Sequence, residues 1–201
     1  MNKRISLVLF TIVVTIVFIA PISLAYLVTK PIVTLNEEVF LKRAVLLAAG
    51  LDLPGTNTEV RDLFDRRVET LPAVSGAEPV HRVKDESGGT AGWVLTRTGP
   101  GLWGDITMVV GFAADRERLT GIEFLKQSET PGLGARVSEA WFKQQFRGKR
   151  GPFTTVGEGE PAKENEFDAV TGATITSNAV KAIVNAVVGE AGSLAGQGGN
   201  Q

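Results

Sequence analysis

Four hydroxyl side chains lie within a short stretch near the carboxyl end of the chain, DAVTGATITSNAV at residues 168–180. They belong to Thr171, Thr174, Thr176 and Ser177, and an apolar helical pattern follows them directly. Ser and Thr at the start of a helix commonly cap its free backbone N–H groups. The same N–H groups, together with the positive end of the helix dipole, attract anions. Two interpretations are therefore open: plain capping, or a site for a phosphate-bearing ligand.

Two small residues, Gly172 and Ala173, remove bulk inside this stretch, so that a ligand could approach the backbone closely. The glycine spacing of a Walker loop, and the lysine that precedes its Ser or Thr, are both missing. The chain contains no cysteine, which excludes disulfides, thiolate metal sites, iron–sulfur clusters and thiol catalysis by this chain alone. We predict no metal site and no catalytic residue. A redox centre would have to be an organic cofactor or belong to a partner.

The charge of the chain is close to balance, with a formal net charge of -1. Residues 1–30 carry Lys3, Arg4 and Lys30 and no acidic residue, so the remainder is slightly acidic. A protein that binds nucleic acid normally presents a clustered basic surface. The composition therefore argues against nucleic acid as a partner.

Residues 5–29 contain no charged side chain and, as a helix, are long enough to cross the roughly 30 Å hydrocarbon layer of a membrane. Lys3 and Arg4 precede this segment, so the positive-inside rule predicts a cytoplasmic amino terminus. We expect a single-pass anchor at residues 1–30 in the inner (plasma) membrane, with the following domain on the periplasmic or extracellular side. The alternative is a cleaved signal sequence, since SLA at residues 23–25 is similar to a cleavage site.

The pattern after the anchor predicts one α+β domain in which an antiparallel sheet is flanked by helices. Helical spacing continues over a stalk or cover at residues 31–75, and a domain at residues 76–190 precedes a disordered tail at residues 191–201. Within these bounds the sequence predicts helices at residues 36–55, 56–71, 136–149 and after the hydroxyl cluster, four strands within 78–85, 90–99, 104–115 and 118–128, and a loop at 150–166.

The segment DAVTGATIT, residues 168–176, resembles the flavinylation motif of the FMN-binding domain family, D-x-x-S/T-G-A-T/S-x-T. In that family a separate flavin transferase takes the FMN moiety from FAD and esterifies its phosphate to the last threonine of the motif. The resemblance implies that Thr176 carries covalent FMN. It also implies supporting roles in recognition, capping or clearance for the rest of the motif: Asp168, Thr171, Gly172, Ala173 and Thr174.

A second segment, ETPGLG at residues 129–134, resembles a loop found in the G subunit of the Rnf electron-transport complex and in the C subunit of the sodium-translocating NADH:quinone oxidoreductase. A tight turn alone explains its proline and glycines. It does not explain Glu129, Thr130 and Leu133. The resemblance implies that these three residues line the flavin site, together with Leu102 and Trp103 of the segment GPGLWGDI at residues 99–106. Packing at a strand edge is the alternative for Leu102 and Trp103.

The resemblance implies a membrane-anchored electron-transfer subunit with no complete reaction of its own. Its partners would be the other subunits of an Rnf-type ion-translocating ferredoxin:NAD oxidoreductase complex, the lipid bilayer and, for maturation, the flavin transferase. The short chain and the segment TGATITS favour the Rnf protein over its quinone oxidoreductase relative. Two further alternatives stay open, an exported scaffold subunit without a cofactor and a stand-alone extracytoplasmic flavin reductase.

Overall fold

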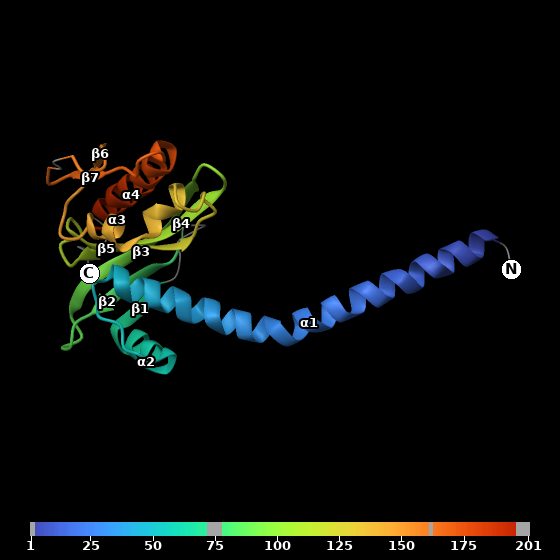
Figure 1. The fold of residues 1–201 in the computed structure, drawn as a ribbon. Coiled ribbons are helices and arrows are strands. Elements are labelled where there is room, and N and C mark those ends of the chain that lie inside the picture. Colours follow the sequence, from blue (N-terminus) through green and yellow to red (C-terminus); the bar gives the residue numbers. More distant parts are fainter. Residues whose placement is uncertain (1–2, 72–77, 161–162, 196–201) are drawn as a thin grey trace. The chain divides into compact units, whose positions relative to one another are not determined.

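The computed structural model describes residues 3–71, 78–160 and 163–195. The chain divides into two units, residues 1–39 and residues 40–201, and each is described by itself. The tail predicted to be disordered at residues 191–201 is helical over residues 191–195, and its remainder lies outside the described residues. Helices and strands are labelled in Figure 1.

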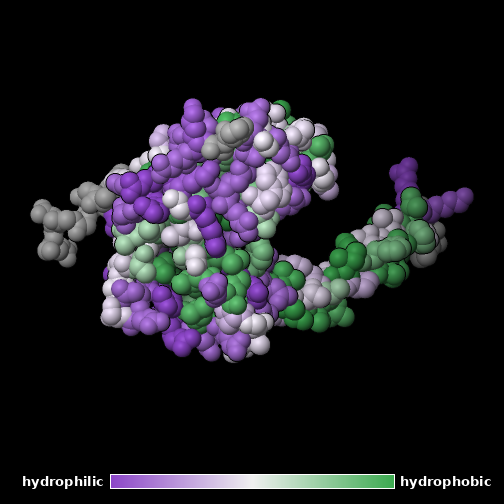
Figure 2. Space-filling model, turned by 60° about the vertical axis from the view of Figure 1, so that its left-hand side comes forward, coloured by the Kyte–Doolittle hydropathy of each residue, from purple (hydrophilic) through white to green (hydrophobic). Residues whose placement is uncertain are grey.

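The first unit is the greater part of a single long helix, α1 (Lys3–Ala48), which is apolar and long enough to cross a membrane. Pro21 and Pro31 lie inside it, and membrane helices tolerate such residues because other groups can satisfy the freed backbone. Figure 2 shows that most of the surface of this helix is hydrophobic. The helix runs without a break through residue 30, where the sequence predicted that the anchor would end.

In the second unit, α2 (Asn57–Arg67) starts with a capping box. The Thr56 hydroxyl accepts from the Glu59 N–H at 3.3 Å, and the Glu59 carboxylate accepts from the Thr56 N–H at 3.1 Å. The helix was expected to continue to residue 71, but Val68–Leu71 form strand β1 instead. Strand pairing overrides the helical spacing here, since Val68 pairs with Val83 and Leu71 with Val80.

Five antiparallel strands form the sheet in the order β1-β2-β3-β4-β5, so that neighbours along the chain are neighbours in the sheet. The last four confirm the predicted strands: β2 (Val80–Lys84), β3 (Thr90–Pro100), β4 (Asp105–Ala113) and β5 (Leu119–Lys126). The longest pairing joins β3 and β4 from Gly92↔Ala113 to Pro100↔Asp105. The turn that follows Pro100 therefore lies at one end of the sheet.

The main core lies between one face of the sheet and the helices α3 (Ala140–Gln144) and α4 (Thr174–Ala195) (Figure 1). Alternate side chains of β4 enter this core, as expected for a strand with two covered faces: Ile106, Met108, Val110 and Phe112. α4 contributes Val180, Val184 and Val187, each fully buried. This packing fixes the position of the helix that follows the hydroxyl cluster.

The opposite face of the sheet receives the last turns of α1. The Thr120 hydroxyl donates to the Ala48 carbonyl at 2.6 Å. A Cβ added at Gly111 would lie 2.0 Å from the same carbonyl oxygen. Gly111 pairs with Gly121 on the neighbouring strand. Because neither glycine has a side chain, the backbone at the end of α1 contacts the sheet directly at this position.

The segment expected to form one helix at residues 136–149 is instead a 3₁₀ helix, η1 (Gly134–Ser138), followed by the short α3. Its apolar residues still enter the core, because Phe142 and Phe146 pack against Phe153 and Phe167 with ring centroids 4.7–5.6 Å apart. Those two partners come from the segment beyond residue 150. Clustering of aromatic rings, rather than helical periodicity, determines the path of the chain here.

The predicted loop at residues 150–166 contains a two-stranded parallel sheet, formed by β6 (Thr154–Val156) and β7 (Glu166–Asp168). Lys149 Nζ donates to the Glu166 carbonyl at 2.6 Å, and Asn185 of α4 bonds both backbone groups of Phe153. β7 ends at Asp168. The hydroxyl cluster is therefore held between a strand and the long helix α4.

Candidate functional site

One cavity brings the two sequence motifs together. It has a volume of about 320 Å³ and lies between the segment after β5 and the start of α4. Its lining includes eight of the eleven predicted site residues, Leu102, Glu129, Thr130, Leu133, Gly172, Ala173, Thr174 and Thr176. Two residues that were not predicted also line it, Gly134 and Ile175. Asp168, Thr171 and Trp103 do not line it.

Thr176 and Glu129 form the buried end of this cavity. The Thr176 hydroxyl donates to Glu129 Oε2 at 2.6 Å across 47 residues of sequence. Thr176 is 1% exposed and Glu129 is 4% exposed. A hydrogen bond to a carboxylate is short and strong, and more so away from water. The last threonine of one motif is therefore bonded to the first residue of the other.

The other carboxylate oxygen of Glu129 holds the turn between β3 and β4. Oε1 accepts from the Leu102 N–H at 2.8 Å and from the Trp103 N–H at 3.3 Å. The indole N–H of Trp103 donates to Thr130 Oγ1 at 3.0 Å. Trp103 thus lies next to the cavity without lining it, and it ties the turn to the predicted loop.

Two glycines make room for the Glu129 carboxylate. A Cβ at Gly101 would lie 2.5 Å from Oε1, and a Cβ at Gly134 would lie 2.9 Å from Oε2 and 2.7 Å from Thr176 Oγ1. All three distances are too short for real contacts. Glycine is required at position 172 for a different reason. Its backbone has a positive φ of 77°, a conformation that residues with a Cβ adopt only at a cost.

The remaining hydroxyls of the cluster have separate roles. The Ser177 hydroxyl accepts from the Val170 N–H at 3.0 Å and donates to the Ala173 carbonyl at 3.1 Å, which fixes the turn before α4. Thr174 opens the helix and lines the cavity. The first N–H groups of α4 have no intrahelical acceptors, so this end of the helix favours an anion.

Asp168 and Thr171 bond to a neighbouring loop. Asp168 Oδ2 accepts from the Gly159 N–H at 2.9 Å, and the Thr171 N–H donates to Glu158 Oε2 at 2.7 Å. Glu158 also pairs with Arg136, with 2.8 Å between Oε1 and the guanidinium. Arg136 and the Thr171 N–H together lower the pKa of Glu158 from 4.5 to about 2. Nothing in the sequence pattern pointed to this Glu158 contact, because its partners are distant in the chain.

We expect Glu158→Gln to lower the melting temperature at pH 7 by roughly 2 °C, because the amide loses the charged pairing with Arg136. The folded-state pKa lies below the ordinary value, so the stabilisation is present above pH 4.5 and is lost as the pH falls through about 2. Thermal melts across this range should show the difference between the two proteins disappearing. Glu160→Gln, in the same turn, is the control. A difference that persists at pH 2 would contradict this explanation.

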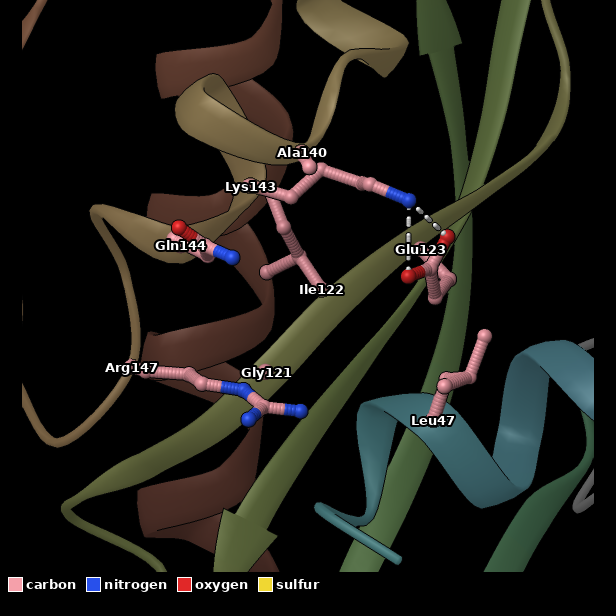
Figure 3. A pocket seen from close by; sticks show the side chains of 8 residues that line it. All are labelled: Leu47, Gly121, Ile122, Glu123, Ala140, Lys143, Gln144 and Arg147. Atoms are coloured by element: carbon pink, nitrogen blue, oxygen red, sulfur yellow. Dashed lines mark hydrogen bonds and ion pairs between the residues drawn. The ribbon is translucent and has the colours of Figure 1, made fainter. Parts of the chain in front are cut away.

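A second cavity, of about 250 Å³, lies at the β5 edge of the sheet and contains neither motif (Figure 3). Lys143 Nζ reaches the Glu123 carboxylate there, at 2.7 and 2.8 Å from its two oxygens. The charges of Lys143 and Glu123 therefore satisfy each other. Among the described residues there is also no cluster of His, Asp and Glu suited to a metal ion.

The comparisons place this chain in a flavin-binding class of proteins: it belongs to the FMN-binding domain family, whose model matches residues 101–189. It is 32% identical over 183 residues to the G subunit of the ion-translocating oxidoreductase complex of Methanosarcina acetivorans, covering 89% of this chain and 90% of that protein. It is 41% identical over 104 residues to the G subunit of the Na⁺-translocating ferredoxin:NAD⁺ oxidoreductase complex of Acetobacterium woodii. That alignment covers 50% of this chain and 49% of the relative, so the chain matches about half the length of the Acetobacterium protein.

The fold is also that of a solved structure, the C subunit of the Na⁺-translocating NADH-quinone reductase from Parabacteroides distasonis. The TM-score is 0.68 at 20% identity, and the match covers 86% of this chain and 98% of that one. The predicted fold class and family resemblance are thereby confirmed.

Proposed function

We propose that the chain is a membrane-anchored electron-transfer subunit that carries FMN as a phosphoester on Thr176, within an Rnf-type ion-translocating ferredoxin:NAD oxidoreductase complex. The main observation that supports this proposal is the hydrogen bond from Thr176 Oγ1 to Glu129 Oε2, at 2.6 Å. It joins both flavin-related motifs in one cavity, with the hydroxyl of the proposed attachment residue at its inner end.

The residues present fit the FMN phosphate. A phosphodiester keeps a single negative charge, which the start of a helix can hold without a lysine clamp. Thr174 and Thr176 belong to the first turn of the 22-residue helix α4. Gly172 has a left-handed backbone conformation, which favours glycine, so no side chain at this position obstructs the phosphate. In this proposal the first turn of α4 binds the phosphate and Thr176 anchors it.

The rim of the cavity fits an aromatic ring. Leu102, Leu133 and Ile175 are large apolar side chains that are 47%, 45% and 60% exposed. Ligand sites are commonly lined by such side chains with a few polar groups that set orientation. In this proposal Leu102 and Leu133 contact the isoalloxazine, and Thr130 lies beside the ring and the ribityl chain.

FMN supplies reversible acceptance and release of electrons when it is bound, and the protein supplies position and electrostatics. The chain itself has no cysteine and so holds no iron–sulfur cluster of its own. With one flavin bound, the chain would act as a relay between partners. Donor and acceptor sites are therefore assigned to other subunits of the complex.

The proposed location is the inner (plasma) membrane, with α1 as a retained anchor. Lys3 and Arg4 support a cytoplasmic amino terminus, and the flavin domain is then on the periplasmic or extracellular side. A covalent link suits that side, because a dissociated flavin would be lost from an open compartment.

Membership of an Rnf-type complex is favoured over the sodium-translocating NADH:quinone oxidoreductase. The match to the G subunit of Methanosarcina acetivorans covers 90% of that protein at 32% identity, whereas the match to the quinone reductase C subunit of Haemophilus ducreyi covers only 42% of that protein, at 38% identity. Purification of the native protein distinguishes a subunit of a larger complex from a stand-alone flavin reductase. Co-purification of a multi-subunit membrane complex supports this proposal, and isolation of a stand-alone flavin reductase contradicts it.

The attachment is tested by intact mass spectrometry of the chain co-expressed with a flavin transferase. We expect the wild-type mass to increase by one FMN less water, and Thr176→Ala to show no increase. Thr154→Ala, an exposed threonine on β6, is the matched control and should be loaded like the wild type. Absence of the wild-type increase would favour the cofactor-free scaffold. An increase that persists in Thr176→Ala would place the link elsewhere.

A further inference from the structure

The Glu129 carboxylate has a fixed orientation. Oε1 accepts from two backbone N–H groups of the turn at residues 102–103, which leaves Oε2 directed at the Thr176 hydroxyl. All three donors are neutral, and both side chains are buried. The carboxylate is therefore an acceptor held against the one hydroxyl that the proposed function requires to react.

A threonine hydroxyl is a weak nucleophile at neutral pH, and enzymes activate such groups with an adjacent base. The base must lie within about 2.6–3.2 Å of the oxygen that carries the proton it removes. Glu129 Oε2 meets this condition at 2.6 Å.

We propose that Glu129 Oε2 accepts the proton of Thr176 Oγ1 while the flavin ester forms, an inference that rests on the proposed function. Thr176 Oγ1 bonds to the FMN phosphorus of FAD, which the transferase presents, as the phosphoanhydride bond breaks and AMP leaves. The hydroxyl proton passes to Glu129 Oε2, and no atom changes oxidation state. The acceptor chain therefore contributes a catalytic group to its own modification.

The position of the proton after the reaction follows from the same geometry. Before the ester forms, Oε2 accepts a hydrogen bond from Oγ1; afterwards Oγ1 carries no hydrogen, and an ionised carboxylate would face an anionic phosphodiester. Two like charges this close repel strongly in a buried site. A protonated Glu129 removes this repulsion and can donate to the ester oxygen atoms.

The test is the single-turnover rate of FMN incorporation into the full detergent-solubilised chain, measured by intact mass with purified transferase and FAD. We expect Glu129→Gln to reduce the rate about 100-fold or more, because the amide keeps the shape but accepts no proton.

Glu123→Gln is the matched control, since Glu123 bonds Lys143 at the second cavity (Figure 3), and its rate should equal that of the wild type. Thermal melts identify any loss of folding. Glu129→Ala provides a second variant, in which added formate should restore incorporation in a dose-dependent manner.

A Glu129→Gln rate within about threefold of the wild type, well below the effect expected of general base catalysis, would overturn the inference. So would a Glu129→Ala variant that formate fails to restore. Either result would leave the proposed function standing, provided that the wild type gains one FMN and Thr176→Ala gains none.

Discussion

Gly134→Ala is expected to reduce FMN incorporation about 100-fold, with little change in the fold. The new methyl group would lie 2.7 Å from Thr176 Oγ1 and 2.9 Å from Glu129 Oε2, so it would force the two groups apart. Gly134 lacks the positive φ that would make alanine strained for conformational reasons. The effect should therefore fall on the reacting pair. Incorporation is measured by intact mass, and folding by thermal melting.

The control for this substitution is Gly104→Ala in the adjacent turn. Its methyl group would meet only Ser128, at an ordinary distance of 3.8 Å from Cβ. We expect normal loading with FMN. A Gly134→Ala protein that is loaded at the wild-type rate would show that the Thr176–Glu129 contact is dispensable.

Gly111→Ala is expected to destabilise the second unit by about 3 kcal/mol, the upper end of ordinary overpacking. A Cβ at this position would lie 2.0 Å from the Ala48 carbonyl oxygen and 2.5 Å from Thr120 Oγ1. The clash is with backbone, so a side-chain rotation cannot relieve it. The last turn of α1 would have to move away, exposing Val45 and Leu46, both fully buried. We expect the melting temperature to fall by roughly 6–12 °C.

Gly189→Ala is the control of opposite sign. Gly189 lies inside α4 and has no neighbouring atom within 4 Å of an added Cβ. Alanine there should stabilise the helix by roughly 0.5–1 kcal/mol. If Gly111→Ala melts at the wild-type temperature, the close contact between helix and sheet does not contribute to stability.

Local patterns were sufficient to predict most of the sheet. β2 to β5 have β-branched and aromatic residues between clear turns, and they pair in chain order, so short-range signals identify them. β1 was missed, because Val68 and Leu71 also fit the helical spacing of the segment before them. The decision between helix and strand there depends on the pairing partners in β2, which local spacing does not reveal.

The parallel pair β6 and β7 could not be predicted for a related reason. Each strand has three residues, and the pairing joins Thr154 to Glu166 across a segment rich in glycine and charge. Its stability depends on contacts with other elements, such as the bonds from Asn185 of α4 to Phe153. No pattern within the segment indicates those contacts.

The site was predictable at the level of its motifs but not of its contacts. The resemblance identified both segments, and the fold brings most of their residues to one cavity. The bond between Thr176 and Glu129 spans 47 residues, so no spacing rule could have paired them. Asp168 and Thr171 belong to the same motif, yet their bonds go to Gly159 and Glu158 instead.

The Glu129 carboxylate lies between two glycines, one facing each oxygen atom. Evolution could not easily alter these three positions one at a time. A larger residue at Gly101 or Gly134 would meet the carboxylate at once, whereas loss of the carboxylate would free both glycine positions and detach the turn at residues 102–103. We therefore expect positions 101, 129 and 134 to vary together among related chains. Relatives that have lost the acceptor threonine should be the first to replace the glutamate at position 129 and to carry larger residues at positions 101 and 134.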